Sequence, residues 1–300
     1  MFRKIIFDND GVNIDSEHIA MQDMDEFGYK LVHKYVPSCS SGLSRGDIYT
    51  EYKGWSSNAI IEDLINKHSL PEDDIRETFD IPEGDDLYEH LSNLHTNSVI
   101  AKFQSGMLKT LPGFASTIEK IRERFGQGNI ALCTTSRTDR MHATEAAIDP
   151  DTGQKANWGE FFPKDGNLRV SGYGYKNKYE HFRSLNPSWD PDETVIVEDT
   201  ASSTKKAIDA GFDNVIGIVA SKFQTQDTNG NFDPEKQRQE MESLLKAGAK
   251  IIVTDYRDIP FAIDWMSNGM NPDQKPDFVS TVEYNSGEGR VVPDAQKFEL

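Results

Sequence analysis

The sequence has 300 residues, of which 36% are hydrophobic and 27% charged, a composition that fits a folded protein of one or two domains. Its formal net charge of −18 disfavours nucleic acids and anionic membranes as partners, because both bind basic surfaces. It contains only two cysteines and no apolar run long enough to cross a membrane, so we expect a cytoplasmic protein without a disulfide framework.

The first predicted element is a short buried strand at residues 5–7, followed directly by Asp8, Asp10 and Gly11. In a parallel sheet, ligands bind beyond the carboxyl ends of the strands, and glycine lets the chain turn sharply there. Two carboxylates one residue apart repel each other unless a cation lies between them, and oxygen ligands suit Mg²⁺. A strand that ends in an ordinary Asp-Gly turn is the alternative interpretation.

Residues 16–105 have helical patterns and contain no convincing strand. Prolines and glycines divide this segment into short helices. Two apolar faces are recognisable, one of Ile60, Ile61, Leu64 and Ile65 and one of Leu87, Leu91 and Leu94. We therefore predict an all-helical domain inserted into a core domain of residues 1–15 and 106–266, with residues 267–300 as an irregular C-terminal tail.

The core domain continues with alternating strands and helices. Strands are predicted at residues 129–133, 195–197, 215–219 and 251–253, and helices at 178–185, 202–210 and 234–247. This alternation predicts an α/β fold with a doubly wound, Rossmannoid parallel sheet and right-handed crossovers.

The polar loop at residues 147–157 raises the question of a second cation site. Asp149, Asp151, Asn157 and Glu160 have the spacing of ligands in a calcium-binding loop. Gln154, however, stands where such a loop needs glycine for its bend, which favours a solvated turn.

Polar residues of complementary kinds follow the later strands. Thr134-Thr135-Ser136-Arg137 offers hydroxyl groups and free amides at the start of a helix, a combination that binds anions. Glu198-Asp199 places two more acids at a strand end, and Lys176 and Lys178 precede the next helix. Taken alone, each pattern also fits an ordinary helix cap or a solvated lysine.

Taken together, these residues predict a site for phosphoryl transfer. Asp8 would attack phosphorus as a nucleophile, while Asp10 would protonate the leaving oxygen and later activate water. Mg²⁺ held by Asp8, Asp10 and Asp199 or Glu198 would neutralise phosphate charge. Thr134 and a lysine would bind the phosphate oxygens.

The segment Phe-Asp-Asn-Asp-Gly-Val-Asn-Ile-Asp-Ser-Glu at residues 7–17 closely resembles the first motif of the haloacid dehalogenase superfamily. The similarity is strongest to the branch of β-phosphoglucomutase and phosphoglycolate phosphatase. Leu111-Pro112-Gly113 resembles the return from the helical cap of that branch. Residues 130–137 and 195–200 resemble its second and fourth motifs, so that the resemblance covers about residues 1–265.

The resemblance implies a magnesium-dependent phosphatase with an aspartyl-phosphate intermediate at Asp8. Its metal ligands would be the Asp8 carboxylate, the backbone carbonyl of Asp10, and Asp199, with Glu198 as a further ligand. The phosphate-binding lysine of the family normally precedes proline, whereas this chain has Lys176-Asn177-Lys178. Counting back from the aromatic residue Phe182 favours Lys176, with Lys178 as the alternative.

The expected substrate is a small phosphorylated metabolite, with sugar phosphates first. Its predicted contacts are Gly11, Thr135, Ser136 and Arg137 in the core, and Lys53 and Trp55 in the cap. A packing role for Trp55 and a salt bridge for Arg137 are the alternatives.

Two other functions remain open, a phosphomutase and a catalytically silent binding protein on the same fold. The resemblance places Ala20 and Ser57 where the mutase has a histidine and an arginine, which favours hydrolysis. We expect a monomer or a small homo-oligomer.

Overall fold

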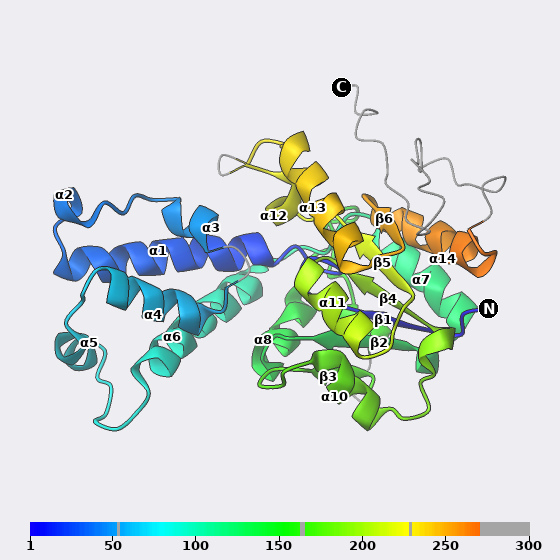
Figure 1. Ribbon diagram of the computed structural model, residues 1–300, viewed down its shortest axis with the longest axis horizontal. Coiled ribbons are helices and arrows are strands. Elements are labelled where there is room, and N and C mark those ends of the chain that lie inside the picture. Colours follow the sequence, from blue (N-terminus) through cyan, green and yellow to red (C-terminus); the bar gives the residue numbers. More distant parts are fainter. Residues whose placement is uncertain (53–54, 163–165, 228–229, 271–300) are drawn as a thin grey trace. The chain divides into compact units, whose positions relative to one another are not determined.

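A computed structural model describes residues 1–52, 55–162, 166–227 and 230–270 (Figure 1). The chain divides into two units, one of Met1–Ser16 with Gly106–Leu300, the core, and one of Glu17–Ser105, the cap. The boundaries between core and cap lie within one residue of the predicted ones. Most of the predicted tail lies outside the described residues.

The described part of the core contains one six-stranded sheet in the order β3-β2-β1-β4-β5-β6, in which every pairing is parallel. The strands are β1 (Lys4–Phe7), β2 (Ile130–Thr134), β3 (Arg169–Ser171), β4 (Thr194–Glu198), β5 (Val215–Ile218) and β6 (Ile251–Val253). This confirms the predicted doubly wound α/β fold. The sequence analysis missed β3, because three residues with arginine at one end and serine at the other do not form an apolar run.

Strand β1 lies in the middle of the sheet, between β2 and β4. Ile6 is opposite Ala131 on one side and Ile196 on the other, and all three side chains are fully buried. A strand buried on both faces reads as a continuous apolar run, which explains why β1 was recognisable from the sequence. Because the strands are parallel, the residues that follow β1, β2 and β4 emerge at the same edge of the sheet.

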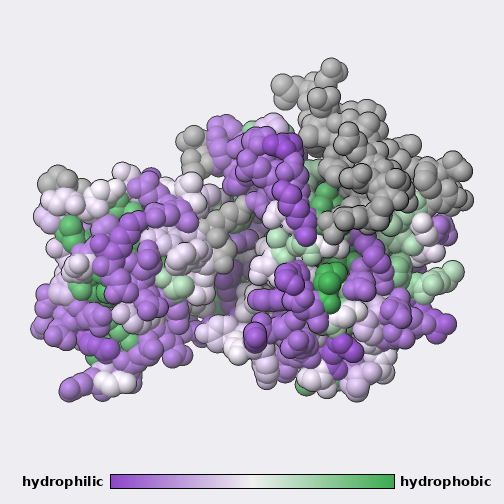
Figure 2. All heavy atoms as spheres, in the orientation of Figure 1, coloured by the Kyte–Doolittle hydropathy of each residue, from purple (hydrophilic) through white to green (hydrophobic). Residues whose placement is uncertain are grey.

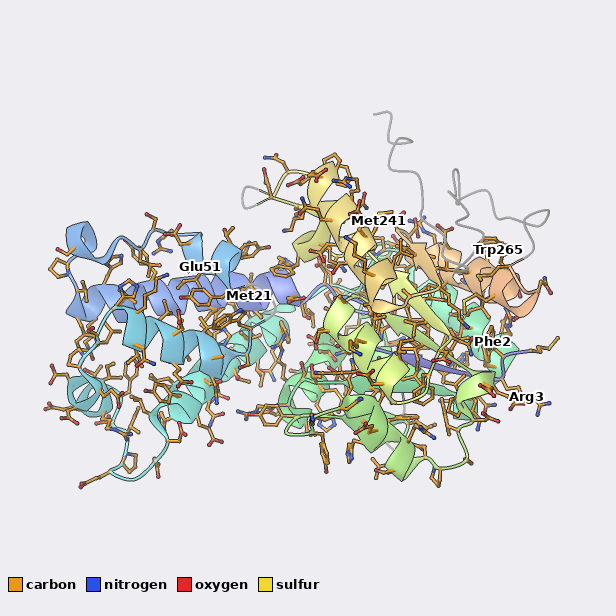
Figure 3. The ribbon with its side chains drawn as sticks, viewed as in Figure 1. Phe2, Arg3, Met21, Glu51, Met241 and Trp265 are labelled. Carbon is orange, nitrogen blue, oxygen red and sulfur yellow. The ribbon has the colours of Figure 1, made fainter. Side chains whose placement is uncertain are left out.

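One helical layer consists of α10 (Lys178–Leu185), α11 (Ala201–Asp209) and α13 (Pro234–Ala247), with α11 between the other two (Figure 1). Their apolar side chains pack in one cluster with Ile6, Ala131 and Ile196 of the sheet. Met241 of α13, labelled in Figure 3, belongs to this cluster. Burying these apolar faces is the main free-energy gain that holds the layer on the sheet.

The other layer contains α7 (Phe114–Phe125), α9 (Trp158–Phe161) and α14 (Ile259–Ser267). Its contacts are largely aromatic: Phe7 of β1 stacks on Tyr256 at 6.2 Å between ring centroids, and Phe114 meets both Tyr256 and Phe161. The remaining core helices are α8 (Thr138–Ala143) and α12 (Lys222–Thr225), with short 3₁₀ turns at Gln127–Asn129, Thr144–Ala146, Pro191–Glu193 and Tyr256–Asp258.

The cap is helical throughout its described part, as predicted. Its helices are α1 (Glu17–Tyr35), α2 (Ser38–Ser41), α3 (Asp47–Glu51), α4 (Ser57–Lys67), α5 (Glu72–Thr78) and α6 (Leu87–Lys102), followed by a π-helical turn at Phe103–Met107. The apolar face of α4 is buried, but Leu94 of α6 is exposed, so its predicted place on a buried face is wrong. His95 is buried instead, because its ring nitrogens contact Ser57 and the Ala20 carbonyl.

Among the helices of the described ranges, none combines the length and the apolar character needed to cross a bilayer.

Candidate active site

Three carboxylates meet where β1 and β4 end. Asp8 follows β1, Glu198 is the last residue of β4, and Asp199 comes next in the chain. Ligand oxygens of the three lie within 4.8 Å of one another, and all three side chains are buried. The structure thus brings together three of the four acids assigned to one cation from the sequence, and the Asp10 carboxylate is not in this group. Their hard oxygen donors fit a Mg²⁺ ion.

Gly11 is needed for this arrangement. Its φ of +79° is unfavourable for residues with a side chain, and a Cβ atom there would lie 1.9 Å from Oδ2 of Asp199. The loop is closed by the Gly11 amide, which donates to the carbonyl of Ile14 at 2.8 Å. The glycine therefore lets the backbone after β1 approach Asp199. This role is structural and does not require that Gly11 contact the substrate.

The lysine at the site is Lys178, and the sequence-based preference for Lys176 is wrong. Lys178 Nζ lies 2.9 Å from Asp8 Oδ1 and 2.7 Å from Glu198 Oε1, whereas Lys176 is exposed. Asn177 caps α10 by accepting from the Tyr179 amide at 2.9 Å, so Lys178 starts the helix and its side chain turns inward.

A glycine makes room for this lysine. A Cβ atom on Gly172 would lie 2.3 Å from Cβ of Lys178. Counting residues back from Phe182 could not identify Lys178. The helix α10 begins where Asn177 caps its N-terminus, and the distance to an aromatic residue does not set that position.

Burial has the largest effect on the pKa values of Asp8 and Lys178. Burial raises the pKa of Asp8 to about 7, with Lys178 opposing the shift and Glu198 adding to it. Burial alone would lower the pKa of Lys178, but Asp8 and Glu198 together raise it above its ordinary value, so the ammonium stays charged. One buried cation facing three carboxylates leaves an excess of negative charge, which a divalent cation would balance.

Glu198 has partners for both carboxylate oxygens. Tyr179 donates its hydroxyl to Oε1 at 2.5 Å, the oxygen that Lys178 also contacts, and the Asp199 amide donates to Oε2 at 3.2 Å. Glu198 therefore positions Lys178, while Asp8 and Asp199 are better suited as primary cation ligands. Tyr179 was not predicted as a site residue, and it occupies the place of the proline in the Lys-Pro pattern.

The Asp10 carboxylate is held by hydroxyl groups and an arginine. Oδ1 accepts from Ser16 at 2.5 Å and from Arg140 at 3.1 Å, and Oδ2 accepts from Ser136 at 2.7 Å and Thr134 at 3.3 Å. Burial alone would raise the pKa of Asp10, but Arg140 and the three hydroxyls outweigh it and hold the pKa below its usual value.

This cluster places two predicted residues, Thr134 and Ser136, next to Asp10. Arg140 was not predicted, and its signal was its position in α8, the short helix that follows the hydroxyl-rich segment at residues 134–136.

The other predicted substrate contacts are Thr135 and Arg137 in the core and Lys53 and Trp55 in the cap. Thr135 is exposed, and Arg137 pairs with Asp139 at 2.6 Å. Trp55 in the cap is 51% exposed and meets Tyr52 edge-on at 5.4 Å between centroids. Lys53 lies outside the described residues.

The loop at residues 147–157 does not gather its acids around a common point. Asp149 accepts from the Asp151 amide at 2.8 Å, and Asp151 accepts from the Gly113 amide at 2.7 Å. Within the described ranges, the one group of three ligands close enough to hold a metal ion is Asp8, Glu198 and Asp199. The two loop carboxylates thus stabilise turns.

No protein-family model matches the sequence, and no curated protein matches it. Solved structures do match the fold. A haloacid dehalogenase hydrolase of family IA, variant 3, from Entamoeba histolytica superposes with a TM-score of 0.61 at 16% identity, covering 89% of this chain and 100% of that one.

Two further structures match over similar lengths. A family hydrolase from Deinococcus radiodurans, solved with bound phosphate and sodium, gives a TM-score of 0.56 at 17% identity over 89% of this chain and 96% of that one. The β-phosphoglucomutase of Clostridium difficile gives a TM-score of 0.54 at 13% identity, over 90% of this chain and 98% of that one. The chain therefore has the fold of haloacid dehalogenase-like hydrolases.

Proposed function

We propose that this protein is a magnesium-dependent phosphatase of the haloacid dehalogenase superfamily, and that it hydrolyses a small phosphate monoester through an aspartyl-phosphate on Asp8. The observation that carries the proposal is the position of Asp8, buried 2.9 Å from Lys178 and grouped with Asp199. The motif at residues 7–17 and the shared fold support the same function. The Deinococcus radiodurans structure of the same fold contains bound phosphate and sodium, which supports the proposal.

The side chains have complementary roles in this reaction. An Asp8 oxygen would form a bond to phosphorus while the bond from phosphorus to the ester oxygen breaks, and Asp10 would give its proton to the leaving alkoxide. In the second step, Asp10 would take a proton from water as the water oxygen attacks phosphorus and releases Asp8 and inorganic phosphate. Asp8, Asp199 and the Asp10 carbonyl would hold Mg²⁺, which supplies charge neutralisation for the phosphoryl group.

Lys178 and Thr134 support both steps. The buried ammonium of Lys178 would compensate the charge on the phosphoryl oxygens, where it acts strongly because burial reduces screening by water. Thr134 is 1% exposed at the end of β2, and its hydroxyl contacts the Asp10 carboxylate. The protein's negative charge makes these local cations and the metal ion necessary for binding a phosphate anion.

The test is phosphate release from a panel of phosphate monoesters, including sugar phosphates, with Mg²⁺ and after its removal by a chelator. We expect turnover with Mg²⁺, none after chelation, and none in Asp8→Asn. Asp264→Asn is the matched control, because Asp264 is an exposed carboxylate on α14, paired with Arg124 at 2.7 Å.

Phosphate release by Asp8→Asn at the wild-type rate would contradict the role of Asp8. Conversion of a sugar phosphate into its isomer without phosphate release would identify a mutase. Absence of turnover with every ester would favour a binding protein.

A further inference from the structure

A groove of about 800 Å³ crosses the solvent side of α11, between α10 and α13. Figure 2 looks onto this helical layer, where hydrophilic residues prevail. The charged side chains that line the groove are Lys176, Lys205, Lys206 and Lys246, with Glu180 and Asp209. Four cations and two anions give the groove a positive charge, whereas the protein as a whole carries −18.

Ion pairs within the chain involve only two of the four lysines. Lys205 pairs with Asp209 at 2.8 Å, and Lys246 lies 3.9 Å from Glu242. Among the described residues, no carboxylate lies within ion-pair distance of the ammonium group of Lys176 or Lys206. Cations that share a groove without a counter-charge repel one another, and a bound anion would remove this repulsion.

The groove is held in shape by the helices that form it. The Asn177 side chain donates to the carbonyl of Lys206 at 2.8 Å and so joins the start of α10 to α11. Ala201 and Ser202, in the first turn of the nine-residue helix α11, also line the groove. Amides at a helix start carry partial positive charge and attract anions, which adds to the effect of the lysines.

We propose that this groove binds a small anion with at least two phosphoryl charges, at a place separate from the Asp8 site. Lysines act as point charges that accept phosphate in varied geometries, and several of them favour a multiply charged anion over a single phosphate. The groove has room for more than one phosphate group, and together with its lysines it fits a diphosphate or a phosphorylated metabolite. The proposal does not depend on the phosphatase function.

The experiment is calorimetric titration of the full-length protein with inorganic pyrophosphate, in metal-free buffer at low and at physiological salt. We expect binding that weakens with salt. The double variant Lys206→Gln with Lys246→Gln should weaken it at least about tenfold, since it removes two charged contacts. Orthophosphate should bind more weakly than pyrophosphate.

The matched control is Lys120→Gln with Lys155→Gln. It removes the same charge from two exposed lysines outside the groove, one of them on α7 in the opposite layer. This control should bind pyrophosphate like the wild type. Asp8→Asn, which alters the other phosphate site, should retain the groove binding. The proposal is overturned if pyrophosphate does not bind, if the groove variant binds it like the wild type, or if the control loses as much affinity.

Discussion

The Lys178 ammonium lies 2.9 Å from the Asp8 carboxylate, with the lysine side chain fully enclosed. In water such a contact contributes little, but in a buried site it keeps the Lys178 ammonium charged and sets the direction in which Asp8 faces. The pair joins the first strand of the sheet to the start of α10, which are far apart in the sequence.

Replacing Lys178 should abolish most of the activity, whereas replacing Lys176 should not. We expect Lys178→Ala to lower kcat at least about 100-fold, the effect of removing one preorganised charge from a transition state. Lys176→Ala should stay within about twofold of wild type, as exposed substitutions usually do. Steady-state phosphate release measures both, and circular dichroism checks that each variant is folded. A larger loss in Lys176→Ala than in Lys178→Ala would contradict the assignment.

Tyr179→Phe should lower kcat about tenfold, because a hydrogen bond to a charged group contributes about 1.5–3 kcal/mol and this one orients Glu198 against Lys178. KM should change little, since the hydroxyl contacts Glu198 and not the substrate. Tyr256→Phe is the comparison, because it removes another buried tyrosine hydroxyl, which donates to Asn13 at 2.8 Å. If both variants lose equal kcat for an equal loss of thermal stability, the hydroxyl of Tyr179 has only a structural role.

Arg140→Ala should raise the pKa of Asp10, because Arg140 is the strongest of the groups that lower it. Protonated Asp10 is the acid of the first step, and its pKa lies below the usual carboxyl value, so the alkaline limb of kcat/KM, where Asp10 loses its proton, should lie at acidic pH. Removing Arg140 therefore moves this alkaline limb to higher pH while the maximal rate decreases. The measurement is kcat/KM across pH. Arg137→Ala, which removes a neighbouring arginine paired with Asp139, should leave the limb in place.

Gly11→Ala should destabilise the protein and weaken Mg²⁺ binding together. The new Cβ would overlap Oδ2 of Asp199, and the positive φ adds strain of about 1 kcal/mol or more. Thermal unfolding and calorimetric Mg²⁺ titration measure the two effects. Gly174→Ala shares a positive φ but has no neighbouring atom within 4 Å, so it should lower stability without affecting Mg²⁺. Unchanged Mg²⁺ affinity in Gly11→Ala would argue against Asp199 as a ligand.

Local patterns determined the α/β fold, the helical insertion and the acids of the site. Strands buried on both faces, such as β1 and β4, require apolar runs, and such runs are visible in the sequence. Asp8 and Glu198-Asp199 were recognisable because carboxylates directly after such runs must emerge at the same edge of a parallel sheet. The strands and the acids that follow them were predictable because each depends on the residues of one short segment and on the parallel direction of the strands.

Only the tertiary structure decided which cations and hydroxyls surround these acids. Whether Lys176 or Lys178 faces Asp8 depends on the residue at which α10 begins and on the space above Gly172, where a Cβ would meet Lys178. The contact of Arg140 with Asp10 joins the helix α8, which follows β2, to the loop that follows β1. Such contacts depend on the packing of distant segments, because a difference of one or two residues in a helix start turns a side chain from solvent into the core.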